Sequence, residues 1–297
     1  MYSLPKAISV CLDNHFFKDV MCHDSQCSSI SVNCILDLIR NNEYVEVLIL
    51  SGKSLKINEW SSSLTHLNIS ISWEIENPDY VFDSNTIIPS VYQIRYPVFL
   101  QELVGNCRYY KSIFDRISTL GYKFKVAVIY MDRYSLDYIE KLPVIAKELL
   151  DMGIMICVFP LPYFFLKEDN RIRKKDFWRI AEIVNNIAEE LGNKVYGDFP
   201  VGGTKHKNIA GVCPSNGLML SVLPDGTFSP CRFSKLNLGN IIESSLFSVL
   251  KKWEETRNTN NEFCSKCNDY SICRSGCVAN WDESQNTDYY CLHLNCI

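Results

Sequence analysis

The feature that most constrains this chain is a series of cysteines in its last third. Twelve residues separate the first of them from a glycine, and four more separate that glycine from the next cysteine. Four cysteines then lie within CSKCNDYSICRSGC, and a seventh follows near the end of the chain. Four thiolates commonly hold a [4Fe–4S] cluster, and a C-x-x-C pair lets one turn present two sulfurs to neighbouring irons. Zinc is the alternative, because an isolated C-x-x-C pair is also common in zinc sites. The seven cysteines are Cys213, Cys231, Cys264, Cys267, Cys273, Cys277 and Cys291.

The whole chain has 14 cysteines, a number that indicates disulfides in a secreted protein and metal binding in a cytosolic one. Its beginning, MYSLPKAISVC, contains no apolar stretch long enough for the core of a signal peptide. The longest apolar run, residues 153–166, is interrupted by Pro160 and Pro162 and is too short to span a bilayer. We therefore expect a cytoplasmic protein with reduced thiols and no membrane partner. Cys107 and Cys157, each within an apolar segment, are expected to be buried thiols.

Apolar segments alternate between strand-like and helix-like patterns through the first two thirds of the chain. This order builds a parallel sheet covered by helices. Several strand segments are continuous apolar runs such as VLIL and VAVIYM, as expected for strands buried on both faces. Six strands with helices between them predict an α/β fold, in the form of a partial (β/α)6 barrel. The predicted strands are residues 7–11, 45–50, 66–72, 91–96, 123–131 and 154–159.

Three helices are predicted from apolar periodicity and from residues that end helices. One apolar face covers residues 99–120 with Gly121 as the stop, and another covers residues 177–191 with Gly192 as the stop. Between them, Pro143 fits the first position of a helix that ends before residue 153.

The character of the sequence changes after about residue 200, where glycines cluster and cysteines become dense. The segment LMLSVLPDGTFSPC predicts a β-hairpin with Asp225 and Gly226 at its turn. We place a boundary at 195–205 and expect two domains, a barrel over residues 1–200 and a small cysteine-rich domain over residues 201–297.

Charge and short motifs exclude several functions. The 30 Lys and Arg residues against 34 Asp and Glu residues give a formal charge of −4, without the basic excess that binding to a phosphate backbone needs. No nucleic-acid partner is therefore expected. The sequence SGKS at residues 51–54 lacks the upstream glycine of a phosphate-binding loop, and neither G-x-S-x-G nor H-E-x-x-H occurs.

The complete arrangement, C-x12-G-x4-C, gap, C-x2-C-x5-C-x3-C, gap, C, resembles the SPASM domain at the C-terminus of radical SAM enzymes that modify peptides and proteins. The hairpin before Cys231, the Leu238-Gly239-Asn240 segment before a helix, and the CRSGC ending resemble that family as well. The resemblance covers residues 210–295 and implies two auxiliary [4Fe–4S] clusters. It also implies a radical-SAM-like partial (β/α)6 barrel, in agreement with the alternation of strands and helices.

The same resemblance implies which cysteines hold each cluster. The first set is Cys213, Cys231 and Cys277, and the second set is Cys264, Cys267, Cys273 and Cys291. The first set is one ligand short. Three alternatives stay open for the eighth position: His206, Cys296 or an open site. Cys296 is also an alternative to Cys291, at a spacing that fits less well.

Two departures from the family concern its N-terminal cluster and its S-adenosylmethionine site. The usual C-x3-C-x2-C motif is missing after the first strand, where Cys11, Cys22, Cys27 and Cys34 stand at wider spacings. Where the family commonly carries Gly-Gly-Glu-Pro after its second strand, Lys53 places a cation that repels the ammonium group of the ligand. We therefore expect the barrel to be kept and the reductive cleavage of S-adenosylmethionine to be lost.

The expected function is that of an iron–sulfur SPASM-domain protein of ribosomal-peptide maturation, similar to the SPASM proteins of grasp-with-spasm cassettes. It would bind a precursor peptide or a partner maturase, and an ATP-grasp ligase or an intact radical SAM enzyme would perform the covalent chemistry. The alternative is an active peptide-modifying radical SAM enzyme whose atypical first cluster is built from Cys11, Cys22 and Cys27. A protein stabilised by zinc, with no redox role, is a third hypothesis.

Overall fold

The structure is a computed structural model, and it divides the chain into two compact units. The first unit combines Met1–Ile94 with Pro214–Asn260, and the second combines Arg95–Cys213 with Asn261–Ile297. The domain boundary near residue 200 rests on the character of the sequence and stays a prediction. The structure describes residues 6–12, 31–42, 45–52, 69–75, 91–192, 194–197, 219–258, 262–268, 270–273, 276–281 and 288–291.

The first unit is built on a run of parallel strands. Strands β1 (Ala7–Cys11), β2 (Val47–Ser51) and β3 (Ser70–Glu74) pair in this order. Helix α1 (Val32–Arg40) lies between β1 and β2 in the sequence, and it begins at Ser31, whose side chain accepts a hydrogen bond from the Asn33 backbone. All three strands end in mostly buried residues. The predicted strands 7–11, 45–50 and 66–72 are therefore present, the last two shifted by a few residues.

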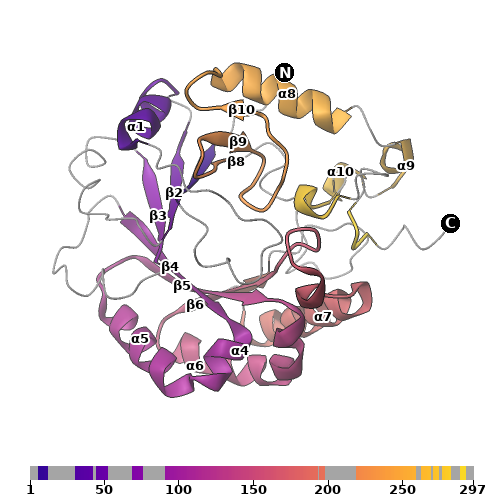
Figure 1. Ribbon diagram of the computed structural model, residues 1–297. Helices are drawn as coiled ribbons and strands as arrows, with labels where there is room; N and C mark the ends of the chain where they lie inside the picture. Colours follow the sequence, from indigo (N-terminus) through magenta and orange to yellow (C-terminus); the bar gives the residue numbers. More distant parts are fainter. Residues whose placement is uncertain are drawn as a thin grey trace. The chain divides into compact units, whose positions relative to one another are not determined.

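The predicted hairpin belongs to the same sheet. Strand β8 (Met219–Val222) pairs in parallel with β1, and β9 (Thr227–Ser229) pairs with β8 in antiparallel fashion. The short strand β10 (Gly239–Asn240) adds to β9, which gives the order β10-β9-β8-β1-β2-β3 (Figure 1). The cysteine-rich part of the sequence thus supplies strands to the sheet that the N-terminal part begins.

The hairpin turn and the helix after it form as the sequence predicts. Gly226 has a φ of 84°, and the Asp225 side chain accepts a hydrogen bond from the Thr227 backbone at 2.9 Å. Helix α8 (Leu246–Asn258) follows β10. It buries apolar side chains at helical spacing, namely Leu246, Val249, Leu250 and Trp253.

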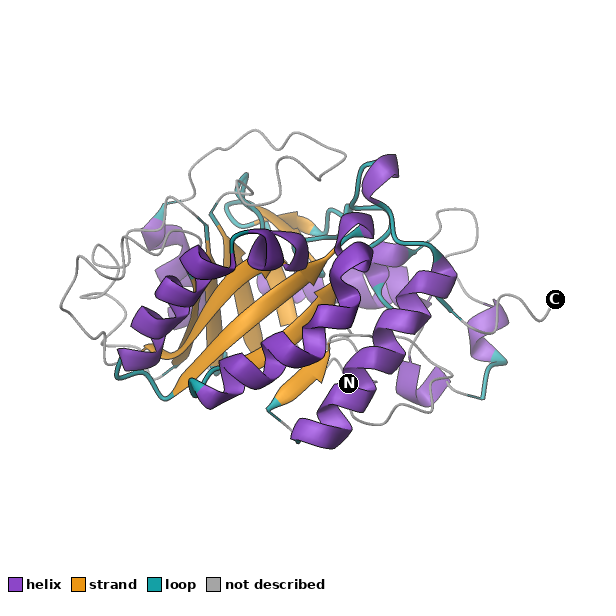
Figure 2. Cartoon of the chain, turned by 90° about the horizontal axis from the view of Figure 1, so that it is seen from below, coloured by secondary structure: helices purple, strands orange, loops and turns teal. Residues whose placement is uncertain are grey.

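The second unit repeats the parallel pattern with strands β5 (Phe124–Met131), β6 (Met155–Pro160) and β7 (Val195–Gly197). Residues 126–131 of β5 are all buried, which explains the continuous apolar run VAVIYM. Strand β4 (Val91–Phe99) contributes residues to both units. Figure 2 shows helices lying against one face of the strands.

Helices alternate with these strands. Helix α6 (Leu142–Asp151) carries Pro143 in its first turn, and α7 (Lys174–Leu191) ends at Gly192, whose φ is 82°, so both predictions are confirmed. The predicted single helix over 99–120 is wrong. It is broken at Asn106 into α4 (Leu100–Gly105) and α5 (Cys107–Thr119), because Asn106 leaves the helical region with a φ of −123° and a ψ of 42°.

The remaining elements are short. The 3-10 helices η2 (Arg133–Lys141) and η3 (Glu168–Asn170) follow strands β5 and β6. In the cysteine-rich end, α9 (Glu262–Ser265), α10 (Tyr270–Cys273) and the 3-10 helix η4 (Val278–Asn280) each span about one turn. In the part of the chain that is described, no helix has both the length and the apolar character needed to cross a membrane.

Candidate functional site

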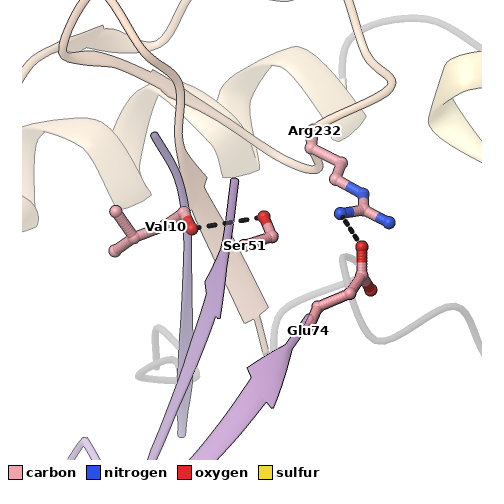
Figure 3. Close-up of polar contacts among 4 residues, drawn as sticks. All are labelled: Val10, Ser51, Glu74 and Arg232. Atoms are coloured by element: carbon pink, nitrogen blue, oxygen red, sulfur yellow. Dashed lines mark hydrogen bonds and ion pairs between the residues drawn. The ribbon is translucent and has the colours of Figure 1, made fainter. Parts of the chain in front are cut away.

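The carboxyl ends of β1 and β2 bring a thiol and a hydroxyl to one edge of the first unit. The register pairs Cys11 with Ser51, and these residues are 2% and 0% exposed. The Ser51 hydroxyl donates a hydrogen bond to the Val10 carbonyl at 3.4 Å (Figure 3), and the Leu12 backbone donates to the Ser51 carbonyl at 2.9 Å. Ligands of parallel α/β sheets bind at this edge. Cys11 therefore lies at the edge of the sheet where a ligand would bind.

A buried ion pair lies at the end of the next strand. Glu74 ends β3, and its Oε1 accepts a hydrogen bond from Arg232 Nη1 at 2.7 Å (Figure 3). The two side chains are 2% and 10% exposed, and the guanidinium also lies 4.9 Å from the centre of the Phe233 ring. A charge-assisted contact of this kind is much stronger when it is shielded from water. The contact holds Arg232, the residue after Cys231, at the end of β3.

This ion pair balances the negative charge that Glu74 places at the end of β3. The charge of the Glu74 carboxylate is compensated by Arg232, so its attraction for a further cation, such as an ammonium group, is reduced. Sequence reasoning missed both residues. The available signal was a carboxylate at the end of the apolar SISWE segment and an arginine directly after a predicted ligand, Cys231. Lys53, the cation expected to repel the ammonium group of the ligand, lies outside the described residues.

The C-x-x-C pair lies on one turn in the second unit. The Cys267 backbone donates a hydrogen bond to the Cys264 carbonyl at 3.1 Å, just after α9. Cys273 ends α10, and the Gly276 backbone donates to its carbonyl at 3.0 Å. The second predicted set is completed by Cys291, so all four of its cysteines belong to this one unit.

The described residues do not assemble a closed metal site. Within them, no three His, Cys, Asp or Glu side chains gather closely enough to hold a metal ion. The donor set itself suits the group, because four thiolates within one unit are the usual ligands of a [4Fe–4S] cluster. In the first set, Cys231 is 7% exposed and belongs to the first unit, whereas Cys277 belongs to the second.

The other cysteines show one error of the sequence analysis. Cys157 is buried, as predicted, but Cys107 is exposed. The reason is the break at Asn106, which makes Cys107 the first residue of α5, beside a cavity of about 660 Å³ that α5 and α6 help to line. Several residues named in the sequence analysis lie outside the described part, namely Cys22, Cys27, His206, Cys213 and Cys296.

A fully buried carboxylate connects two of the predicted ligands. Asp288 Oδ2 accepts a hydrogen bond from the Cys277 backbone at 2.8 Å, and its main-chain carbonyl accepts one from the Cys291 backbone at 3.0 Å. Burial raises the pKa of Asp288 to about 7, although the backbone hydrogen bonds from Cys277 and Tyr290 and the charge of Lys174 lower it. Nothing in the sequence singles out this residue except its place before Cys291.

Aromatic side chains attach this C-terminal segment to the loop and helix that follow β6. The Tyr290 ring stacks on Phe177 of α7 at 3.9 Å, with an angle of 9° between the planes. Tyr289 stacks on Tyr163 at 3.8 Å. The Tyr163 backbone donates a hydrogen bond to Asn280 Oδ1 at 2.6 Å. These contacts hold Asn280, Tyr289 and Tyr290 against Tyr163 and Phe177 of the same unit.

Comparison with known proteins identifies the cysteine-rich region. Residues 213–268 match the SPASM family, described as an iron–sulfur cluster-binding domain. This SPASM match includes four of the seven predicted ligands, Cys213, Cys231, Cys264 and Cys267. No curated protein matches the sequence.

Among solved structures, SuiB of Streptococcus suis, in a crystal structure with bound S-adenosylmethionine, has a similar fold. The TM-score is 0.62 at 14% sequence identity, and the alignment covers 98% of this chain and 78% of that chain. At this identity the similarity establishes the fold. It confirms the predicted fold class, an α/β fold with a mostly parallel sheet, and the SPASM match confirms the iron–sulfur domain that follows.

Proposed function

We propose that this protein is an iron–sulfur SPASM-domain protein of ribosomally synthesised peptide maturation, which binds a precursor peptide or a partner maturase. The observation that carries the proposal is the SPASM match over residues 213–268, a range that includes four of the seven predicted cysteines. The fold shared with SuiB supports it, because the similarity extends over 98% of this chain.

Two [4Fe–4S] clusters are proposed, which would supply electron transfer or an anchor for substrate when bound. One would be held by Cys213, Cys231 and Cys277, and the other by Cys264, Cys267, Cys273 and Cys291. The C-x-x-C turn supports this assignment, and so does the location of all four cysteines of the second set in one unit. His206, Cys296 and an open site remain the alternatives for the eighth position.

We further propose that the chain does not itself cleave S-adenosylmethionine. The paired state of Glu74 supports this, because the buried carboxylate at the strand edge is already compensated by Arg232. The covalent chemistry would then belong to an ATP-grasp ligase or an intact radical SAM enzyme. A precursor gene and one of these two genes beside the coding sequence would support such a partnership, and their absence would speak against it.

A second candidate function is an active peptide-modifying radical SAM enzyme with a cluster on Cys11, Cys22 and Cys27. One observation favours it: Cys11 lies at the carboxyl end of β1, opposite the buried Ser51. In that case the protein would bind S-adenosylmethionine and yield 5′-deoxyadenosine under reducing conditions.

Iron and acid-labile sulfide per chain, measured after anaerobic reconstitution, separate these candidates. Wild type is compared with a Cys11→Ala, Cys22→Ala, Cys27→Ala triple variant and with a Cys264→Ala, Cys267→Ala double variant. We expect about eight irons in wild type and triple variant and about four in the double variant. Cys107→Ala is the matched control, since this exposed cysteine belongs to neither set, and it should keep the wild-type content.

Other outcomes would change the proposal. About twelve irons in wild type, falling to about eight in the triple variant, would favour the enzyme. Zinc in place of iron, with no sulfide, would overturn both candidates. Production of 5′-deoxyadenosine by the wild type would overturn the loss of S-adenosylmethionine cleavage whatever the iron content.

A further inference from the structure

Asp288 occupies a central place between two cysteines that come from different predicted ligand sets. Its carboxylate accepts a hydrogen bond from the Cys277 backbone through Oδ2, and its main-chain carbonyl accepts one from the Cys291 backbone. The other carboxylate oxygen, Oδ1, accepts from the Tyr290 backbone at 2.8 Å. Asp288 is only 1% exposed, so these bonds are shielded from water.

The backbone before Cys277 is shaped to admit this carboxylate. Gly276 has a φ of +73°, and a Cβ added there would lie 2.5 Å from Asp288 Oδ2. Both the positive φ and the close approach require glycine at this position. The turn before Cys277 therefore depends on direct contact with Asp288.

The segment that carries Asp288 is itself held by hydrogen bonds to Ile172 and Trp178. The Tyr290 hydroxyl donates a hydrogen bond to the Ile172 carbonyl at 3.0 Å, and Trp178 Nε1 donates to the Tyr290 carbonyl at 3.2 Å. The Tyr289 backbone donates to the Asn280 carbonyl at 2.9 Å. Through its carboxylate, Asp288 thus links the backbone of Cys277 to a segment that several hydrogen bonds hold in place.

We infer that Asp288 is a positioning residue, which holds Cys277 and Cys291 in fixed relation to one another before any cluster binds. The assignment of the two cysteines to clusters rests on the proposed function, whereas their positioning by Asp288 rests on the hydrogen bonds alone. A ligand held in place in advance binds its metal group with less loss of conformational freedom. Removing the Asp288 side chain should loosen Cys277 before Cys291. The hydrogen bond to Cys277 uses the carboxylate, whereas the bond to Cys291 uses the main-chain carbonyl.

The test compares Asp288→Ala, Asp288→Asn and Tyr290→Phe in the full-length chain. Asp288→Ala removes both side-chain acceptors, and Asp288→Asn keeps one acceptor oxygen and replaces the other with a donor. Tyr290→Phe is the matched control for a merely structural loss, since it removes the hydrogen bond to Ile172 on the same segment and leaves every Asp288 contact in place.

The first measurement is the rate of iodoacetamide alkylation of individual cysteines in the metal-free protein, followed by mass spectrometry. We expect Asp288→Ala to raise the rate at Cys277 about tenfold, because local opening limits the reaction of a buried thiol. The alkylation rate at Cys277 in Asp288→Asn should lie between the rates in Asp288→Ala and wild type. The buried Cys157 and the exposed Cys107 serve as internal references, and their rates should not change.

The second measurement is the iron and sulfide content and the EPR spectrum after reconstitution. We expect Asp288→Ala to lose iron and to change the EPR signal, whereas Tyr290→Phe should keep both. Equal alkylation of Cys277 in Asp288→Ala and Tyr290→Phe, or an equal rise at Cys157, would overturn the inference. A wild type that binds no iron would overturn the proposed function, and the alkylation rates would still decide the role of Asp288.

Discussion

The two units bury a carboxylate in opposite ways. Glu74 in the first unit and Asp288 in the second are 2% and 1% exposed. Glu74 meets the guanidinium of Arg232, whereas Asp288 accepts hydrogen bonds from the backbones of Cys277 and Tyr290. The first arrangement balances a charge with a charge. The second relies on backbone hydrogen bonds, and burial raises the pKa of Asp288 to about 7 although these bonds and the charge of Lys174 lower it.

The difference shows what each carboxylate is suited to do. A buried ion pair fixes two side chains and balances their two charges. A carboxylate bound to backbone N–H groups fixes the path of the chain itself, here the turns that carry Cys277 and Cys291. The following predictions test this contrast.

The largest effect is expected for Arg232→Met. It leaves Glu74 buried without its cation, and removing one partner of a buried ion pair costs about 3–5 kcal/mol. Urea denaturation of the metal-free protein measures the change in the free energy of unfolding. The double variant Glu74→Gln, Arg232→Met should recover most of the loss. A single Arg232→Met variant as stable as wild type would show that the ion pair contributes little.

The next effect is a pH dependence that is specific to Asp288 in the metal-free protein. Its pKa is raised to about 7 in the folded chain from an ordinary value of 3.8, so the folded chain keeps a proton that the unfolded chain loses. The stability from this group is present at low pH and is lost as pH rises toward 7, by up to about 1.4 kcal/mol per pH unit.

Urea denaturation of wild type and Asp288→Asn between pH 4 and pH 8 isolates this contribution. The difference in the free energy of unfolding should move steadily in favour of the variant up to about pH 7 and then level off. A difference that does not change with pH would mean that the two backbone N–H groups keep Asp288 ionised, contrary to the contrast drawn with Glu74.

A smaller effect is expected for Gly276→Ala. The added methyl would overlap the Asp288 carboxylate at a position with positive φ, and such overpacking costs about 1–3 kcal/mol. Thermal unfolding measures the loss. Gly105→Ala is the matched control: it lies in α4 with no atom within 4 Å of the added Cβ, so it should be neutral or slightly stabilising. Equal effects in the two variants would contradict the close contact with Asp288.

The smallest effect is expected for Tyr290→Phe. This change removes the hydrogen bond to the Ile172 carbonyl and keeps the stacking on Phe177, which corresponds to about 1 kcal/mol. Chemical denaturation of the same metal-free protein measures it. A loss as large as that of Arg232→Met would mean that the aromatic anchor, rather than the ion pair, dominates the stability of the molecule.

The sequence predicted the regular elements well where one local signal dominates. The six strands predicted for the first two thirds of the chain are present as β1 to β6, whereas the short strands β7 and β10 were not predicted. Pro143, Gly192 and the Asp225-Gly226 turn marked element ends correctly. The helix over 99–120 was predicted as one because its apolar periodicity continues through Asn106. Gly105 and Asn106, at the break, are residue types that often end helices, so a local signal was present and was outweighed by the continuing periodicity.

The candidate site was predicted only in part, because its contacts join distant parts of the sequence. The cysteine register led to the iron–sulfur domain without reference to structure. Glu74 and Arg232 are 158 positions apart, and Trp178 and Tyr290 are 112 apart. No spacing rule relates such residues, so neither the buried ion pair nor the attachment of the Asp288 segment could be foreseen.

The pairing of β8 with β1 limits how this protein can be divided. Because the hairpin occupies one side of β1, a chain ending before residue 214 would leave that strand with unpaired backbone groups along its whole length. An exposed edge of this kind invites association with other chains. The cysteine-rich region is therefore not an exchangeable module added to a finished barrel, and duplication, loss or transfer of either part alone would have to repair the sheet first.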